Sequence, residues 1–187
     1  LILFPVVSFG RVMTDSTETK EPEAVENPHV VALIELCGAV ESSTFRGQQR
    51  VIVPAEKSLD ALSLLKSRGF DLLIDVSCVD YLEYRGAKHR YGLVYLLAST
   101  AGRQRLTIRV FVDDPEPTVA SVVPLWEAAN WLEREVWDLF GIRFTGHPDL
   151  RRLVMPEEFT AHPLRKDYPL QGRGERHNFP VITRDHS

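Results

Sequence analysis

Cysteine is scarce in this sequence. Among 187 residues only Cys37 and Cys78 occur, and neither belongs to a Cys-x-x-Cys pair or to a Cys/His pair at zinc spacing. A disulfide scaffold, an iron–sulfur cluster and a structural zinc site each need a denser set of cysteines. The sequence therefore argues against all three, favours a reducing compartment and predicts two small buried thiols.

Long apolar runs are also lacking. The longest uncharged opening, residues 1–9, contains Pro5 and is far shorter than the ~20 residues that a membrane span needs. A signal peptide is disfavoured because Arg11 follows the apolar stretch instead of preceding it. We expect no membrane-spanning segment, and Met13 leaves open whether residues 1–12 precede the natural start.

Neither a basic surplus nor a nucleotide-binding loop is found. The 22 lysines and arginines are outnumbered by 26 aspartates and glutamates, which gives a formal net charge of -4. A general nucleic-acid binder normally shows the opposite balance. The eleven glycines form neither a Gly-x-Gly-x-x-Gly pattern nor a P-loop, so direct binding of a nucleotide is disfavoured as well.

The composition and sequence pattern predict one domain, flanked by two segments that lack its regular apolar pattern. The chain is 44% hydrophobic and long enough to bury a single core. Residues 1–27 are expected to form a disordered acidic leader, because the part after Met13 is rich in Asp, Glu, Ser, Thr and Pro and has no apolar period. Asn27 and Pro28 then have the form of a helix start, and Gly38 that of its end, which predicts a helix over 28–37.

Alternating and helical patterns follow in an order typical of an α+β fold. A short β-branched run at 51–53 precedes a helical pattern that begins near Ser58 and closes at Gly69. Three strands are expected at 70–79, 90–97 and 104–112, and their short connectors imply antiparallel neighbours. In the first of these strands, one face is expected to carry Phe70, Leu72, Ile74, Val76 and Cys78. We predict a mainly antiparallel sheet with helices packed on one face.

Two further helices complete the predicted domain of residues 28–140. Thr118 has the form of a cap for a brief helix that Pro124 ends or kinks. Asn130 and Glu133 have the spacing of a capping box, which would begin a second helix that Gly141 ends. The other face of that helix carries Arg134, Glu135 and Asp138, which we interpret as a solvated or docking face.

Residues 141–187 lack any period and form the C-terminal arm. Prolines recur through the arm, yet it retains many apolar residues, unlike a disordered tail. We predict an extended partner-binding arm and tail. Its backbone groups are expected to find hydrogen bonds only with water or a partner, so that the arm is mobile in the free subunit.

Catalytic and metal sites find little support. Glu133 and Glu135 are two positions apart on a helix and point to different sides, so they cannot share a proton. His147, His162 and His177 lack a metal-ligand spacing, and no serine or cysteine lies in a nucleophile motif. Asp149, Arg151 and Arg152 fit either an anion site or a subunit interface, and the alternating charge favours the interface.

Two stretches nevertheless resemble a known family. Residues 133–154, EREVWDLFGIRFTGHPDLRRLV, resemble the signature of the 30 kDa subunit of respiratory complex I, without departure. Residues 162–170, HPLRKDYPL, are similar to its second characteristic stretch. The leader before residue 28 and the tail after 171 lie outside the resemblance.

The resemblance implies a peripheral-arm subunit of proton-translocating NADH:quinone oxidoreductase. Such a subunit binds no cofactor and has no catalytic residue of its own, because FMN and the iron–sulfur clusters lie in partner subunits. It packs on the 49 kDa subunit near the quinone-reducing region, peripheral to the inner membrane on the cytoplasmic side, or on the matrix side in mitochondria. The residues expected at the subunit interface are Glu133, Arg134, Glu135, Asp138, His147, Arg151, Arg152, Arg165, Lys166 and Asp167.

Within that set, Arg165 and Lys166 are neighbours in an extended segment and should point to opposite sides. Arg165 is the better candidate for a partly buried partner carboxylate, with Lys166 at the rim. Other functions stay open at this point: the homologous subunit of a membrane-bound hydrogenase, a free-standing enzyme that uses His147 or Asp149, or an adaptor unrelated to electron transfer.

Overall fold

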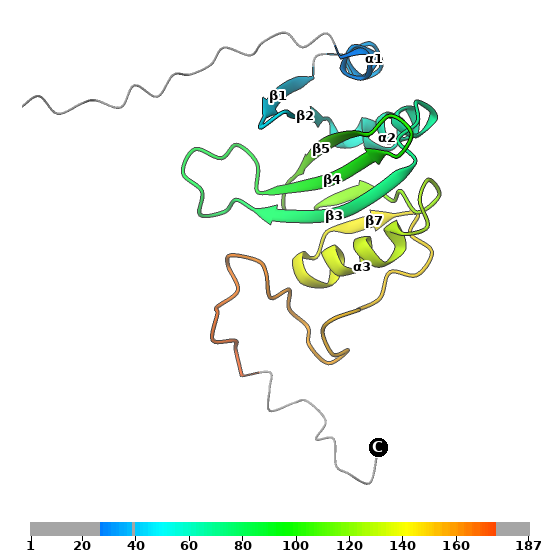
Figure 1. The fold of residues 1–187 in the computed structure, drawn as a ribbon. Helices are drawn as coiled ribbons and strands as arrows, with labels where there is room; N and C mark the ends of the chain where they lie inside the picture. Colours follow the sequence, from blue (N-terminus) through cyan, green and yellow to red (C-terminus); the bar gives the residue numbers. More distant parts are fainter. Residues whose placement is uncertain (1–26, 39, 175–187) are drawn as a thin grey trace, which may run out of the picture.

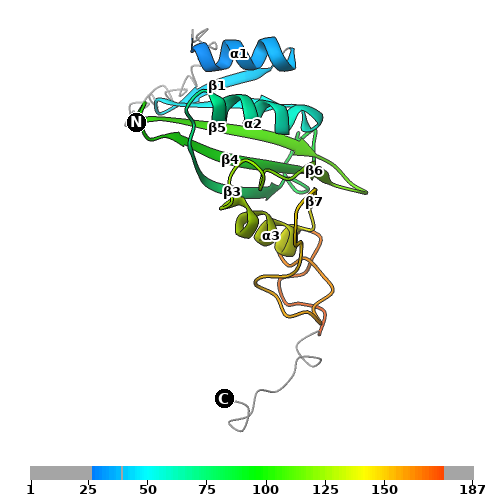
Figure 2. The same cartoon turned by 90° about the vertical axis from the view of Figure 1, so that its right-hand side faces the viewer.

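A five-stranded sheet forms the centre of the molecule. The computed structural model describes residues 27–38 and 40–174, and Figures 1 and 2 show their arrangement in two views. The predicted acidic leader, except Asn27, and the tail beyond Gly174 lie outside the described residues. The sheet strands are β1 (Glu41–Phe45), β2 (Gln48–Val53), β3 (Leu72–Asp80), β4 (Tyr91–Ser99) and β5 (Gln104–Val112).

The strand order is β1-β2-β5-β4-β3, and the pairing is mainly antiparallel, as predicted. The exception is β2, which runs parallel to β5 with Val51 opposite Ile108. The chain leaves β2 through helix α2 (Ser58–Ser67) and forms β3 and β4 before it returns beside β2 as β5. Strand β1, which the sequence pattern did not predict, pairs only with β2 and forms one edge of the sheet.

The predicted inward face of β3 is wrong in its first half. Val76 and Cys78, and Phe70 just before the strand, are buried as expected, but Leu72 and Ile74 are exposed and Leu73 is buried in their place. The register with β4 shifts between Leu73 and Asp75, which is a β-bulge. One extra residue reverses the alternation on its N-terminal side, so that a period-2 pattern cannot place both halves correctly.

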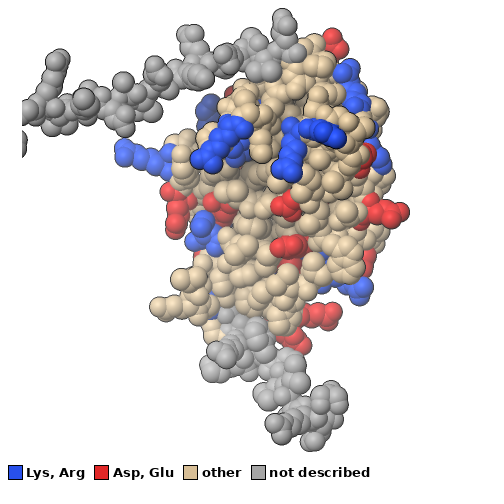
Figure 3. Space-filling model, viewed as in Figure 1, with Lys and Arg blue, Asp and Glu red and all other residues tan. Residues whose placement is uncertain are grey.

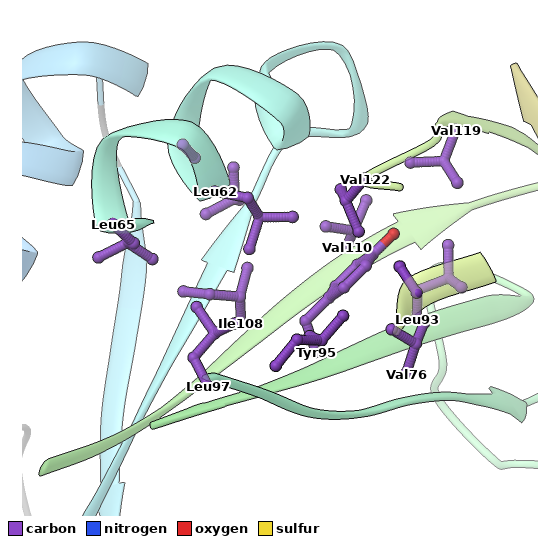
Figure 4. Close-up of a cluster of buried hydrophobic side chains, with 14 of the residues drawn as sticks. Leu62, Leu65, Val76, Leu93, Tyr95, Leu97, Ile108, Val110, Val119 and Val122 are labelled. Carbon is purple, nitrogen blue, oxygen red and sulfur yellow. The ribbon is translucent and has the colours of Figure 1, made fainter. Parts of the chain in front are cut away.

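The helices pack on one face of the sheet, as predicted. Helix α1 (Pro28–Cys37) begins with Asn27, whose side chain accepts a hydrogen bond from the His29 backbone N–H, and ends at Gly38 with φ +84°. Helix α2 presses Leu62 and Leu65 onto the inward residues of β4 and β5 (Figure 4). The core around them is apolar and fully buried.

The region after β5 differs from the prediction. Thr118 begins a strand, β6 (Thr118–Ala120), instead of capping a helix, and β6 pairs in parallel with β7 (Arg143–Thr145). Helix α3 (Ala129–Phe140) begins one residue before Asn130, with Ala128 as its cap and no side-chain cap hydrogen bond. The predicted capping box is therefore wrong, because Asn130 lies inside the helix and Glu133 has another partner.

Among the described residues no helix is long and apolar enough to cross a membrane. Both cysteines are free thiols: Cys78 is buried, as expected, whereas Cys37 is half-buried. Burial raises the pKa of the Cys78 thiol to about 12, so this sulfur is a protonated core atom and not a nucleophile.

Candidate functional site

Helix α3 and the arm that follows it bring most of the expected interface residues together. In Figures 1 and 2 the arm descends from the helix at the end of the molecule farthest from α1. The side chains of Glu133, Arg134 and Asp138 are buried within the chain, so the expected solvated or docking face is wrong for these residues. Each of the three binds another part of the same chain.

Asp138 organises the first part of the arm. One oxygen of its fully buried carboxylate accepts hydrogen bonds from the backbone N–H groups of Leu153 (3.0 Å), Val154 (2.7 Å) and Met155 (2.8 Å). The other accepts from Arg152 Nη1 at 2.5 Å. Three successive N–H groups form a concave nest, an arrangement that binds anions.

The charge on Asp138 is stabilised by these donors. Burial alone raises the pKa of this carboxyl, but the three backbone N–H groups and the Arg152 guanidinium outweigh burial and hold the pKa below its usual value. Asp138 is therefore ionised at neutral pH.

Two arginines complete this attachment. Arg134 donates from Nε to the Arg151 carbonyl at 3.1 Å and from Nη2 to the Arg152 carbonyl at 3.0 Å. Arg152 also donates from Nη2 to the Ala161 carbonyl at 3.2 Å. These bonds satisfy backbone groups that the prolines of the arm keep out of regular structure. The expectation that only water or a partner could do so is wrong for this part of the arm.

The second part of the arm caps the end of α3. The last carbonyls of a helix lack partners within the helix. Here the Asp138 carbonyl accepts from His162 Nδ1 (2.9 Å), the Leu139 carbonyl from the Leu164 N–H (3.1 Å), and the Phe140 carbonyl from Arg165 Nε (2.6 Å). The arm therefore supplies the donors that the helix end needs.

Gly141 makes this close approach possible. Its φ is +78°, and a Cβ at this position would lie 2.6 Å from the His162 ring and 2.7 Å from Arg165 Nη2. Burial lowers the pKa of His162, and the nearby guanidinium groups of Arg165 and Arg152 act in the same direction. The neutral ring with its proton on Nδ1 fits the hydrogen bond to Asp138.

A third attachment joins the arm to the sheet. Asp80, at the end of β3, accepts from the Lys166 N–H at 2.9 Å, and its carboxylate lies 3.4 Å from Arg90 Nη2. Arg90 also pairs with Asp114 and, at 2.9 Å, with Asp167. Hydrogen bonding to Arg90 outweighs burial and lowers the pKa of Asp167. Sequence patterns did not indicate Asp80 or Arg90, because their partners lie far away along the chain.

Glu133 ties α3 to the turn after β6. Its fully buried carboxylate accepts from the Ser121 hydroxyl at 2.6 Å and from the Val122 N–H at 2.7 Å. Burial raises its pKa to about 7, against the opposing effect of these two hydrogen bonds. The structure thus gives Glu133 a titratable structural role, and its neighbour Glu135 is exposed on the other side of the helix.

The remaining expected interface residues lie at or near the surface. His147 donates from Nε2 to the Asn130 carbonyl at 3.1 Å, and its Nδ1 accepts from the Asp149 N–H at 3.0 Å. Arg151 is exposed and pairs with Asp149 at 2.9 Å. Arg165 is half-buried with its guanidinium over the Tyr91 ring, and Lys166 is exposed. A partner carboxylate for Arg165 stays a prediction.

The polar groups described here form hydrogen bonds and ion pairs within the chain itself. In residues 27–38 and 40–174 no group of three or more His, Cys, Asp or Glu side chains is placed to hold a metal ion. His177, one of the three histidines considered above, lies outside the described residues. The polar groups of the site are engaged with backbone carbonyls and N–H groups of the arm, which fixes the arm's shape.

Comparison with known proteins supports the family resemblance. Residues 51–174 match the model of the respiratory-chain NADH dehydrogenase 30 kDa subunit family. An NADH-quinone oxidoreductase subunit of Geobacter sulfurreducens is 43% identical over 152 residues, covering 80% of this chain and 93% of the relative. Subunit 5 of the Thermus thermophilus enzyme is 44% identical over 130 residues, covering 66% of this chain and 63% of that relative.

Two solved structures share the fold. The trypsin-resistant fragment (1-134) of Nqo5 is 36% identical, covers 65% of this chain and 99% of its own length, and superposes with a TM-score of 0.59. A chain of the membrane-bound sulfane sulfur reductase, an archaeal respiratory membrane complex, has a TM-score of 0.67 at 22% identity over 83% of this chain and 91% of its own. The second likeness concerns the fold alone. Together with the match over residues 51–174, the relatives show that the chain belongs to the family of 30 kDa subunits of respiratory-chain NADH dehydrogenase.

Proposed function

We propose that this chain is a peripheral-arm subunit of a proton-translocating NADH:quinone oxidoreductase that docks on the 49 kDa subunit through α3 and the arm. It supports electron transfer from NADH to quinone without a cofactor or catalytic residue of its own, and FMN and the iron–sulfur clusters are carried by partner subunits. The complex is placed at the inner membrane, with this subunit on the cytoplasmic side, or on the matrix side in mitochondria.

One observation carries the docking part of the proposal: the arm is fixed from within while its apolar side chains face outward. Leu153, Val154 and Leu164 are 38%, 58% and 49% exposed, although the N–H groups of all three are bonded to the chain itself. A fixed set of exposed apolar residues, with charged residues such as Arg151 and Lys166 nearby, is the composition of a protein interface.

Assembly tests this proposal. Val154→Glu in the native complex should reduce the amount of assembled complex on a native gel and reduce NADH:quinone activity in the same proportion. Val31→Glu is the matched control, because Val31 is 48% exposed on α1, away from the arm, and should change neither quantity. Normal assembly of the Val154→Glu variant would contradict docking through this surface.

Arg165→Glu separates docking from chemistry. The substitution removes the donor to the Phe140 carbonyl and opposes any partner carboxylate, so failed assembly is expected. Full assembly with abolished activity would instead show that this segment takes part in the reaction. Identification of the co-purified subunits distinguishes the proposal from a hydrogenase, which has nickel in its large subunit. The isolated chain should be colourless and without NADH or quinone turnover.

A further inference from the structure

The face of the sheet opposite the helices carries an unusual set of arginines. We call Arg50, Arg105 and Arg109 the basic face. Arg50 is paired in register with Thr107, which lies between Arg105 and Arg109 on the same side of β5. This register places each of the three Cα atoms within about 7 Å of the Thr107 Cα atom. Figure 3 shows lysine and arginine side chains gathered over the upper part of the molecule, where Figure 1 places β1 and β2.

These guanidinium groups lack acidic partners in the part of the chain that the structure describes. Arg90, Arg151 and Arg152 form ion pairs in the described residues, whereas none of the three arginines of the basic face takes part in one there. The Arg109 Nε atom is buried without a hydrogen-bond partner, and Arg50 lies over the Phe45 ring at 4.7 Å. An arginine that is half-buried and unpaired has lost hydration without a compensating bond, so the basic face is suited to an added anion.

A groove continues from the basic face. It has a volume of about 580 Å³, and Arg109 and Phe111 line it together with Tyr81, Tyr84, Lys88 and His89. Glu41 is its acidic lining residue, and it forms no ion pair with Arg109 or Lys88 among the described residues. The groove extends the positive surface along the sheet and leaves room for a peptide backbone beside the arginines.

We propose that the acidic segment 14–26 of this chain docks on the basic face. The charges are complementary, because the segment contains Asp15, Glu18, Glu21, Glu23 and Glu26 with Lys20 as its one basic residue. The place where the segment enters the fold also fits. The Asn27 side chain donates a hydrogen bond to Gln49 Oε1, next to Arg50 on β2. Because the buried Gln49 side chain points to the helix side of the sheet, the segment has to pass the edge strand β1 to reach the basic face.

Length and tethering both favour this occupant. Residues 15–26 can extend to about 40 Å at 3.3–3.6 Å per residue, enough to pass the edge strand β1 and run across β2 and β5. Attachment at Asn27 gives the acidic residues an effective concentration on the order of millimolar at the basic face. A free acidic partner at lower concentration competes poorly against a segment held there by the chain.

Paramagnetic relaxation in the full chain tests the proposal. A nitroxide label is attached at Ser16→Cys in a Cys37→Ser background, where the remaining Cys78 is buried. The Nε–Hε signals of Arg50, Arg105 and Arg109 should lose intensity, and that of Arg143 on β7 should not. Replacement of the five acidic residues by Asn or Gln, or addition of salt to roughly 1 M, where the Debye length is ~3 Å, should restore the lost signals.

Three other results would contradict docking of the acidic segment on the basic face. Equal broadening of Arg143 and the basic face, no broadening at either place, or broadening that survives neutralisation of the acidic residues would each overturn the proposal. The neutralised variant leaves residues 27–174 unchanged, so the outcome does not depend on whether substitutions in the sheet are tolerated. Arg50→Gln provides a second test. This substitution should weaken the broadening at Arg105 and Arg109, whereas Arg143→Gln, the matched control, should not.

Discussion

Two regions of the molecule, the sheet core under α2 and the junction of α3 with the arm, are held by different forces. Where α2 covers the sheet, Leu62 and Leu65 meet Leu97 and Ile108 in an apolar layer (Figure 4). Where α3 and the arm meet, the contacts are buried charges bonded to backbone groups, with Asp138 at their centre. Apolar contacts have no preferred direction, whereas hydrogen bonds to a nest of three N–H groups require one geometry. The arm is consequently shaped by direction-dependent bonds, and the domain beside it by burial.

Removal of Asp138 should have the largest effect. Asp138→Ala leaves three N–H groups and the Arg152 guanidinium without their acceptor, which costs about 3–5 kcal/mol as for other broken buried pairs. The loss should be local: residues 151–165 become susceptible to protease, and the free energy of unfolding of the sheet changes less. Limited proteolysis beside urea unfolding measures both. Glu135→Ala on the exposed side of α3 is the control, and equal protease resistance of the two variants would contradict the role of Asp138.

The second substitution tests the apolar core under helix α2. Leu62 is fully buried, so Leu62→Ala should lower the free energy of unfolding of the whole domain by about 2–5 kcal/mol. Protease sensitivity of the folded arm should stay unchanged, because the hydrogen bonds that Asp138, Arg134 and Arg165 form to fix the arm do not involve α2. If Leu62→Ala released the arm while the sheet stayed intact, the two regions would not be held independently.

A pH experiment tests how the buried carboxyl group of Glu133 in α3 contributes to the free energy of unfolding. The folded pKa of Glu133, about 7, lies above the ordinary 4.5, so the folded chain binds this proton more tightly than the unfolded chain. The stability that Glu133 contributes is therefore fully present below pH 4.5 and is lost as the pH rises through 7, by about 3 kcal/mol in total. Glu133→Gln should remove this loss.

The measurement compares unfolding free energies of the wild type and Glu133→Gln at pH 5 and pH 8. The difference between the two proteins is the relevant quantity, because His162, whose pKa is lowered, contributes the opposite slope in both. Its contribution cancels in the comparison. A constant difference across this pH range would mean that Glu133 does not titrate as a buried carboxyl.

The smallest effect is expected at the surface of the arm. Arg151 and Asp149 form an exposed ion pair at 2.9 Å, and such pairs contribute about 0–1 kcal/mol. Arg151→Ala should leave both protease resistance and unfolding of the isolated chain nearly unchanged, since Arg134 binds the carbonyl of residue 151 and not its side chain. Loss of complex assembly in this variant would assign the Arg151 side chain to the partner.

The sequence predicts the elements of the apolar core better than the polar contacts between α3 and the arm. Strand β5 and helix α1 have their predicted bounds, because period and caps are local signals. The bulge beside Ile74 leaves no such signal, and it displaced the predicted inward face of half a strand. Local pattern also suggested a capping box at Asn130, which the turn around Ser121 and Val122 overrides by binding Glu133.

The site was predicted as a set of residues but not in its roles. The stretch 133–154 indicated where the family resemblance lies, yet charge alone suggested that Asp138 lay on a solvated or docking face. Its burial depends on N–H groups that begin 15 residues later, and Asp80 meets Lys166 across 86 residues. Pairings of this kind follow from the tertiary fold, so no window along the sequence reveals them.

The dependence of the α3 end on the arm has a consequence for synthesis on the ribosome. Arg165, which donates the hydrogen bond to the Phe140 carbonyl, is synthesised 25 residues after it. At about 5–20 residues per second, translation leaves this helix end uncapped for about 1–5 s, while the sheet strands before it are already complete. A chain that stalls within this interval presents a finished sheet with a frayed helix. The last turn of α3 therefore obtains this hydrogen bond only after the chain has been made as far as residue 165.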